Sequence, residues 1–347
     1  MACLRPSGSG STEDSPPSLP GGHLGPKIRR MGLWDSALDR SIFFAFDASG
    51  FERHAKDFTP LNASLEGQRF IVTGANSGLG LATTRSLAAR GAAVWMLCRN
   101  EERGKAARDM VRTETGSDSV HLELVDMSSL ASVDSFVARF THQAPGPVHA
   151  LVHNAGVLLD KRVETAEGFE LTHATNILGA VRLTHGLRAS LGAGARVVFV
   201  ASGGMYSTPL DLHLLSEPAQ PFDGVKAYAQ TKRAQVELAK VMAAELPTLH
   251  ISAMHPGWAD TPGVSSSLPG FYDRMKKRLR TPAQGADTIL WLATSPEAND
   301  TRGRFYFDRE PAAPTLWFRR ETSDKARRAL WQKLTRDASI QTFGETP

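Results

Sequence analysis

Short apolar runs alternate with stretches of helical spacing along most of the chain, from Gly67 onward. The candidate strands are Arg69–Thr73, Ala93–Cys98, Val120–Val125, Val148–His153, Arg196–Ala201, His250–Met254 and Arg304–Phe307. The intervening stretches show the periodicity of amphipathic helices. Such alternation with short connections is typical of parallel strands covered by helices on both faces. The pattern predicts an α/β fold: a single doubly wound domain with a seven-stranded, mostly parallel sheet.

Amino-acid composition and hydrophobic pattern change outside that region, and these changes divide the chain into four parts. Residues 1–30 are rich in Gly, Ser and Pro, a composition that predicts a disordered extension. An N-terminal helical segment is predicted over residues 31–66, and the doubly wound domain is predicted over residues 67–310. A C-terminal extension that contains a helix is predicted over residues 311–347. Met31 could be an alternative start, in which case the first thirty residues would not belong to the working protein.

The aromatic part of the N-terminal segment, residues 33–51, leaves two interpretations open. One is a helix that packs on the core or covers an opening to it, and the other is a helix on a membrane surface. The segment and its end contain Asp35, Asp39, Asp47 and Glu52. Anionic lipid would repel these carboxylates, so the first interpretation is favoured.

Composition excludes several classes of function. The chain of 347 residues has 40 basic and 36 acidic residues, and its basic residues form no block interleaved with aromatics, so nucleic-acid binding has no support. Cys3 and Cys98 cannot build a disulfide framework, which fits a reducing compartment. Without an evident targeting segment or spanning apolar run, the default location is cytoplasmic. The histidines lack metal-ligand spacing, and no metal site is expected.

A glycine-rich turn directly follows the first strand, in the run Thr73-Gly74-Ala75-Asn76-Ser77-Gly78-Leu79-Gly80. Glycines there allow a tight turn and a close approach of the backbone to a pyrophosphate, which the N-terminus of the next helix would favour. This placement indicates a Rossmann dinucleotide site. The residues expected to contact the cofactor in this turn are Gly74, Asn76, Ser77, Gly78, Leu79 and Gly80.

The end of the second strand distinguishes between the two nicotinamide cofactors. An acidic residue there would bind the ribose hydroxyls of NAD, but the chain has Cys98-Arg99. A guanidinium suits a 2′-phosphate, so NADP(H) is predicted over NAD(H), although Arg99 could also be an ordinary surface residue.

Two further strand ends complete the predicted cofactor contacts. Asp126 and Met127 follow strand three, where Asp126 either contacts the adenine or caps the next helix. Asn154, Ala155 and Gly156 follow strand four, where Asn154 either holds the strand end beside the adenine ribose or serves the turn alone.

Tyr228 and Lys232 provide the candidate chemistry. They are four residues apart in a predicted helix, Val225–Ala244, and therefore lie on one helix face. An ammonium beside a phenol lowers the tyrosine pKa from about 10 toward neutrality, which makes a general acid/base. The pair alone would be weak evidence, because such spacing is common on solvated helices.

Together these features resemble the short-chain dehydrogenase/reductase superfamily over Gly67–Phe307. The glycine-rich turn, Asn154-Ala155-Gly156, a serine at the end of strand five, the Tyr228/Lys232 pair and Pro256-Gly257 occur in the expected order. The stretches 221–224, 254–264 and 284–288 are similar to one particular member of that superfamily. The resemblance implies an NADP(H)-dependent oxidoreductase that interconverts a carbonyl and an alcohol.

The resemblance also implies roles for single residues. The catalytic set would be Asn176, Ser202, Tyr228 and Lys232. Tyr228 would exchange the proton, Ser202 would steady the reacting oxygen, and Lys232 would lower the tyrosine pKa and hold the nicotinamide ribose. Asn176 would anchor a water that links Lys232 to solvent. Pro256, Gly257 and Thr261 would lie over the nicotinamide, while Trp258 either shapes the pocket or packs beneath it.

The substrate entrance is predicted from two apolar walls, the loop Met205–Val225 and the segment Ser265–Leu279. They suggest an apolar or lipid-like carbonyl or alcohol as the small-molecule partner. The resemblance further implies possible homo-oligomers that pair through helices over about Glu167–Leu191 and Val225–Leu246. The competing interpretation is a catalytically silent NADP(H)-binding regulatory or sensor protein.

Overall fold

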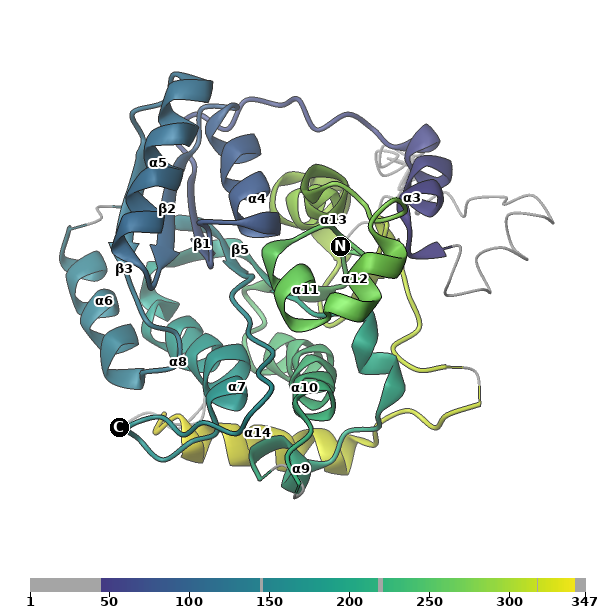
Figure 1. The fold of residues 1–347 in the computed structure, drawn as a ribbon. Helices are drawn as coiled ribbons and strands as arrows, with labels where there is room; N and C mark the ends of the chain where they lie inside the picture. The colour runs from purple at the N-terminus through teal and green to yellow at the C-terminus, as the bar shows by residue number, and fades with distance from the viewer. Residues whose placement is uncertain (1–44, 144–145, 218–220, 317, 341–347) are drawn as a thin grey trace, which may run out of the picture.

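An eight-stranded sheet forms the centre of the protein, for which a computed structural model describes residues 45–143, 146–217, 221–316 and 318–340. The strand order is β3-β2-β1-β4-β5-β6-β7-β8 (Figure 1). The bounds are β1 Arg69–Thr73, β2 Ala93–Cys98, β3 Val120–Leu124, β4 Val148–His153, β5 Leu191–Val200, β6 His250–Met254, β7 Phe305–Phe307 and β8 Glu310–Pro311. The first seven strands pair in parallel, as expected. The prediction missed one strand: β8, two residues long, pairs antiparallel with β7.

Helices cover both faces of the sheet, which confirms the doubly wound prediction. Apolar side chains of alternate strand residues face opposite layers, so Phe70 and Val72 belong to one core and Ile71 to the other. The first layer contains α4 Gly78–Ala88, α5 Glu101–Thr115 and α13 Pro282–Thr294. The second contains α6 Leu130–Gln143, α8 Gly179–Gly186 and α10 Gly224–Glu245.

The chain reverses its direction of winding at β1, which pairs with β2 on one side and with β4 on the other. In an open parallel sheet, a ligand crevice forms at such a switch point, outside the carboxyl ends of the strands. The predicted site residues follow β1, β2, β3, β4, β5 and β6 and therefore share one edge of the sheet.

Local capping explains where the main helices start. The Asp223 side chain accepts a hydrogen bond from Lys226 N and begins α10, close to the predicted Val225–Ala244. The α13 helix begins with a capping box, in which Thr281 and Gln284 satisfy each other's backbone amides.

The helix predicted over Glu167–Leu191 is divided into four shorter elements. Glu170 caps α7 Leu171–His173, a π-turn over Ala174–Leu178 (η2) follows, and α8 ends before a 3-10 turn, η3 Arg188–Ser190. A π-turn inserts one extra residue per turn and is frequent at functional sites, and this one contains Asn176.

Both predicted entrance walls contain short helices rather than extended loops. The first wall contains the 3-10 helix η4 Gly203–Ser207 and α9 Leu212–Ser216. The second wall overlaps α11 Pro262–Ser267 and contains α12 Pro269–Met275. A further 3-10 turn, η5 Pro296–Asp300, precedes β7.

The segments that flank the domain both pack on it. At the N-terminal side lie α3 Ala48–His54 and η1 Ala55–Asp57, while the features predicted for residues 1–44 lie outside the described residues. At the C-terminal side, α14 Asp324–Asp337 lies below α7 and α10 in the view of Figure 1. None of the helices in the described ranges is long and apolar enough to cross a membrane.

The position of α14 bears on the predicted pairing surface. Arg327 in α14 contacts Glu237 of α10 at 2.8 Å, and the carbonyls that follow α14 accept hydrogen bonds from Arg182 of α8. The chain's own C-terminal helix therefore covers parts of both helices through which pairing was expected.

Candidate active site

The glycine-rich turn is fixed to the end of β4 by Asn154. Its amide Nδ2 donates to Thr73 O at 2.9 Å and to Gly74 O at 3.1 Å, while its backbone N donates to Thr73 Oγ1. Gly80 packs so closely here that a Cβ would lie 2.3 Å from Gly74 O. Both glycines are therefore required by the turn itself, and Asn154 holds the ends of β1 and β4 together.

The N-terminus of α4 can receive a phosphate group. Ser77 occupies the cap position but its side chain makes no capping hydrogen bond, so the first-turn amides are not capped from that side. Gly78 has φ +52, and a Cβ there would lie 3.1 Å from Thr261 Cγ2. Two residues predicted to bind the cofactor from opposite ends of the domain, Gly78 and Thr261, are thus adjacent. This arrangement fits a dinucleotide pyrophosphate.

The end of β2 presents one buried and one exposed side chain. Cys98 is buried, and burial raises the pKa of its thiol to about 11, so it is not a reactive thiolate. Arg99 is exposed and has no hydrogen bond or ion pair with any other described residue. Its guanidinium can therefore meet a ligand without breaking an existing contact.

The residues after β3 serve the local structure. Asp126 Oδ1 accepts hydrogen bonds from Ser128 N at 2.9 Å and from Ser128 Oγ at 2.6 Å, which close a turn ahead of α6, a helix that begins only at Leu130. Met127 is buried, and its carbonyl lies so close to Gly179 that a Cβ there would be 2.1 Å away.

Tyr228 and Ser202 meet at the start of α10. Ser202 follows β5, and its Oγ accepts a hydrogen bond from Gly204 N at 3.2 Å, so it caps the turn that begins η4. The same side chain lies close enough to the Tyr228 phenol to lower its pKa. Ser202 therefore both caps the turn and adjoins the tyrosine.

Lys232 lies one turn further along α10, completely enclosed. Its Nζ donates to Val200 O at 2.8 Å and to Gln235 Oε1 at 3.1 Å, and it lies 5.5 Å from the centre of the Tyr228 ring. A Cβ on Gly156 would be 3.2 Å from this Nζ, so the turn after β4 closes the site from the other side.

Gln235 connects Lys232 to Asn176 and was not predicted. While its Oε1 accepts from Lys232, its Nε2 donates to the Asn176 carbonyl at 2.8 Å. The Asn176 amide in turn accepts from Val157 N and donates to Thr231 Oγ1. Asn176 was expected to anchor a water that links Lys232 to solvent, and the direct contact between the two residues runs through the Gln235 side chain. Its signal in the sequence was a polar residue three positions after Lys232, on the same helix face.

The last predicted cofactor residues occupy the turn after β6. Gly257 has φ +72, and a Cβ would be 2.4 Å from Arg280 Nε, so only glycine fits. Trp258, whose role was left open, has its ring 5.9 Å from Phe46 and 5.4 Å from Phe271. Trp258 therefore joins the N-terminal segment to α12.

The site's electrostatics differ from the simple Tyr–Lys expectation. Burial raises the pKa of the Tyr228 phenol, and the nearby Ser202 side chain offsets only part of this. Burial lowers the pKa of Lys232 to about 7, because its partners are neutral oxygens. Both shifts favour the uncharged forms. Among the described residues there is no cluster of three or more His, Cys, Asp or Glu that could hold a metal.

The switch-point crevice, the phosphate-binding turn and the Ser–Tyr–Lys constellation define a dinucleotide-dependent oxidoreductase. The chain belongs to the short-chain dehydrogenase family, whose sequence model matches residues 68–269. Members of this family use NAD(P).

Individual relatives agree with this assignment. The chain is 42% identical to human dehydrogenase/reductase SDR family member 12 over 276 residues, which cover 78% of this chain and 86% of that protein. It is 36% identical to mouse polyprenol dehydrogenase over 282 residues, 76% of this chain and 82% of that protein. An uncharacterised protein from Mycobacterium paratuberculosis shares the fold, with a TM-score of 0.66 and 25% identity over 81% of this chain and 97% of that chain. The resemblance found in the sequence is thereby confirmed.

The buried amine predicts a pH dependence of stability. Because the native pKa of Lys232, about 7, lies below the ordinary lysine value of 10.5, the native state binds fewer protons than the unfolded chain between these values. The free energy of unfolding of the wild type therefore rises as the pH increases from about 7 to about 10.5. Relative to Lys232→Met, we expect the free energy of unfolding of the wild type to rise by about 1 kcal/mol per pH unit between about pH 7.5 and pH 9.5.

Urea denaturation at several pH values measures this difference. Lys226→Met is the matched control, because Lys226 lies on the same helix with an 81% exposed side chain. A wild-type minus Lys232→Met difference that stays flat across the window would show that the amine is not desolvated.

Proposed function

We propose that the protein is an NADP(H)-dependent oxidoreductase that interconverts a carbonyl and an alcohol, with Tyr228 as the general acid/base. The observation that carries this proposal is the grouping of Tyr228, Ser202 and Lys232 at the carboxyl edge of the sheet, where Lys232 Nζ lies 5.5 Å from the centre of the Tyr228 ring and Ser202 is close enough to lower the pKa of the phenol. Two hydroxyl groups that meet there can both approach one substrate oxygen. The adjacent glycine-rich turn would hold the cofactor beside them.

In the direction of reduction, bound NADPH would supply the hydride. The Ser202 hydroxyl would donate a hydrogen bond to the carbonyl oxygen and stabilise its developing negative charge. Tyr228 would donate the proton that completes the alcohol. Its raised pKa keeps the phenol protonated, which suits it as a donor and favours reduction as the working direction.

Lys232 and Asn176 would act around this pair. The Lys232 amine lies near enough to the tyrosine ring to stabilise phenolate when it is protonated, and would hold the nicotinamide ribose. Asn176 supports its position through the Gln235 amide. A pKa of about 7 for Lys232 allows it to change its charge at working pH.

Preference for NADP(H) is supported by the end of β2. Arg99 is exposed there, and its guanidinium forms no hydrogen bond or ion pair with any described residue. The last position of the strand and the position after it hold Cys98 and Arg99, so no carboxylate is present there to bind ribose hydroxyls or to repel a phosphate.

A hollow with both apolar and charged lining residues adjoins the start of α10. An open pocket of about 540 Å³ is lined by Leu158, Leu159, Asp160, Pro221, Phe222, Asp223, Gly224, Val225 and Lys226. It begins one helical turn before Tyr228 and has a size suited to a small ligand. Val225 is 53% exposed at its edge. The name of the mouse relative, which refers to a polyprenol, points to an apolar substrate.

The first prediction concerns the phenol. Tyr228→Phe removes the proton donor and should lower kcat by about 100-fold to 10000-fold, while the Kd for NADPH changes less than about threefold. Stopped-flow turnover and nicotinamide fluorescence measure the two quantities. Tyr206→Phe is the control, because it removes a phenol that is bonded only to the Ala313 carbonyl among the contacts described. Unchanged turnover in Tyr228→Phe would favour the silent cofactor-binding alternative.

The second prediction concerns cofactor choice. We expect tighter binding of NADPH than of NADH, and Arg99→Ala should weaken NADPH binding about tenfold or more while leaving NADH binding within about twofold. Arg103→Ala, in the exposed first turn of α5, is the control. Equal loss of both cofactors, or tighter binding of NADH to the wild type, would contradict a 2′-phosphate contact.

The third prediction concerns the substrate. With NADPH, we expect kcat/KM for dodecanal and all-trans-retinal to exceed that for glucose and sorbose by about 100-fold or more, because burial of long apolar chains provides the binding energy. Val225→Asp should reduce this ratio, whereas Val163→Asp, another exposed valine outside the pocket lining, should not. Good turnover of the sugars without turnover of the apolar aldehydes would overturn the substrate assignment.

A further inference from the structure

Phe46, which precedes the Rossmann domain, is enclosed by the loops at the reaction centre. Its side chain is 6% exposed. Its ring centre lies 4.4 Å from that of His255, 5.1 Å from Phe307 and 5.9 Å from Trp258. These residues follow β6 or end β7, so the N-terminal segment Ala45–Asp57 packs against the carboxyl ends of these two strands.

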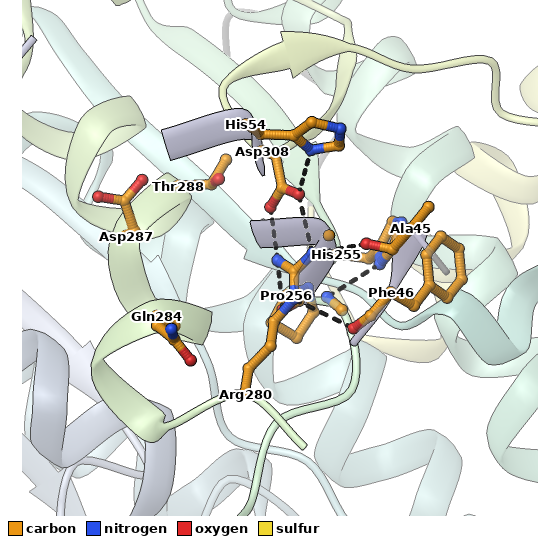
Figure 2. Close-up of polar contacts among 12 residues, drawn as sticks. Ala45, Phe46, His54, His255, Pro256, Arg280, Gln284, Asp287, Thr288 and Asp308 are labelled. Atoms are coloured by element: carbon orange, nitrogen blue, oxygen red, sulfur yellow. Dashed lines mark hydrogen bonds and ion pairs between the residues drawn. The ribbon is translucent and has the colours of Figure 1, made fainter. Parts of the chain in front are cut away.

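Arg280 holds the backbone of this segment. Its guanidinium donates to the carbonyls of Ala45 at 2.8 Å, and of Phe46 and Asp47 at 3.1 Å each (Figure 2). The same side chain donates to Pro256 O at 3.3 Å and thus spans the segment and the turn after β6. Arg280 is 1% exposed, so these bonds replace its entire hydration.

The charge of Arg280 is balanced by Asp308, which is also buried. The two side chains form a bidentate pair at 2.5 and 2.8 Å. Asp308 Oδ2 also contacts His54 Nδ1 of α3 at 2.7 Å. Burying an ion pair costs more free energy than its attraction returns unless its remaining hydrogen bonds are satisfied. Here the N-terminal carbonyls and His54 satisfy them, so the pair depends on the segment.

The segment in turn contacts both loops that carry predicted site residues and restricts where their backbones can lie. A Cβ on Gly203, directly after Ser202, would lie 2.6 Å from Phe46 Cε2. On the other side, Trp258 N donates to Phe46 O at 2.7 Å, and a Cβ on Gly257 would lie 2.7 Å from the same oxygen. One residue therefore contacts the turn after the predicted catalytic serine and the turn predicted over the nicotinamide.

We propose that Phe46 is a positioning residue of the active site, and that Arg280 and Asp308 hold it between the Ser202–Gly203 and Gly257–Trp258 turns. The segment Ala45–Asp57 is then a fixed wall of the reaction centre rather than an appendage. Its kinetic consequence rests on the proposed function, whereas its structural consequence does not. The two are tested separately.

The structural test pairs Phe46→Ala with Gly203→Ala. In the wild-type background the added methyl group meets the Phe46 ring, so Gly203→Ala should lower Tm by about 3–6 °C. With Phe46→Ala the space is open, and the same substitution should cost less than half as much. Equal costs in both backgrounds would show that Phe46 is not seated against Gly203 and would overturn the proposal.

Hydrogen exchange adds a readout that needs no substrate. In Phe46→Ala, the amides of residues 203–207 and 257–260 should exchange about threefold faster or more than in Phe58→Ala. Phe58 is the matched control because it belongs to the same N-terminal region but stacks on Arg309, 4.3 Å away, rather than on either turn. If Phe46→Ala does not fold, Phe46→Leu serves the same comparisons. Equal exchange in the two variants counts against the proposal.

The kinetic test asks whether Phe46 acts through Ser202. With dodecanal and NADPH, Phe46→Ala should lower kcat about tenfold with KM changed less than threefold, but by less than twofold in a Ser202→Ala background. Equal losses in both backgrounds would mark Phe46 as merely structural and overturn the positioning role. If the wild type reduces none of the carbonyls of the panel, the proposed function fails, and the Tm cycle with hydrogen exchange decides whether the wall exists.

Discussion

The structure depends on the burial of polar side chains along a single helix, α10. Gln230, Thr231, Lys232, Arg233, Gln235 and Glu237 are each at most 3% exposed. A buried polar group without partners costs free energy, so each of these side chains needs a partner from another element. The partners come from η2, β5, the η4 region and α14. The hydrogen bonds that these buried side chains of α10 require therefore fix the position of the elements around the candidate site, including the C-terminal helix α14.

The same burial sets the acid–base character of the site. Tyr228 and Lys232 share a helix face, yet burial moves both groups toward their neutral forms. The expected attraction between ammonium and phenolate requires a charge that this environment disfavours. The Val200 carbonyl and Gln235 supply only neutral acceptors to the amine. A site of this kind holds its proton on the phenol and releases it only when a neighbouring change stabilises the phenolate.

The sequence was sufficient for those parts of the fold that depend on local pattern. Strand periodicity predicted the seven parallel strands, and the turn Thr73–Gly80 was recognisable because its glycines lie between a strand and a helix. The span of α10 was predicted to within one residue at each end, and in the structure Asp223 caps its start. These features follow from residues that are close together in the chain.

The missed features depend on residues far apart in the chain. The π-turn at Asn176 forms where its side chain bonds to Thr231, and Gln235 becomes a bridge only when the Asn176 carbonyl is above it. Phe46 looked like part of a generic aromatic stripe, because the sequence does not show that Arg280 binds its carbonyl. The Gln235 and Arg280 contacts both end on backbone carbonyls, and a carbonyl is present at every residue. Sequence composition therefore carries no signal for such a contact, and only the folded geometry selects which carbonyl is used.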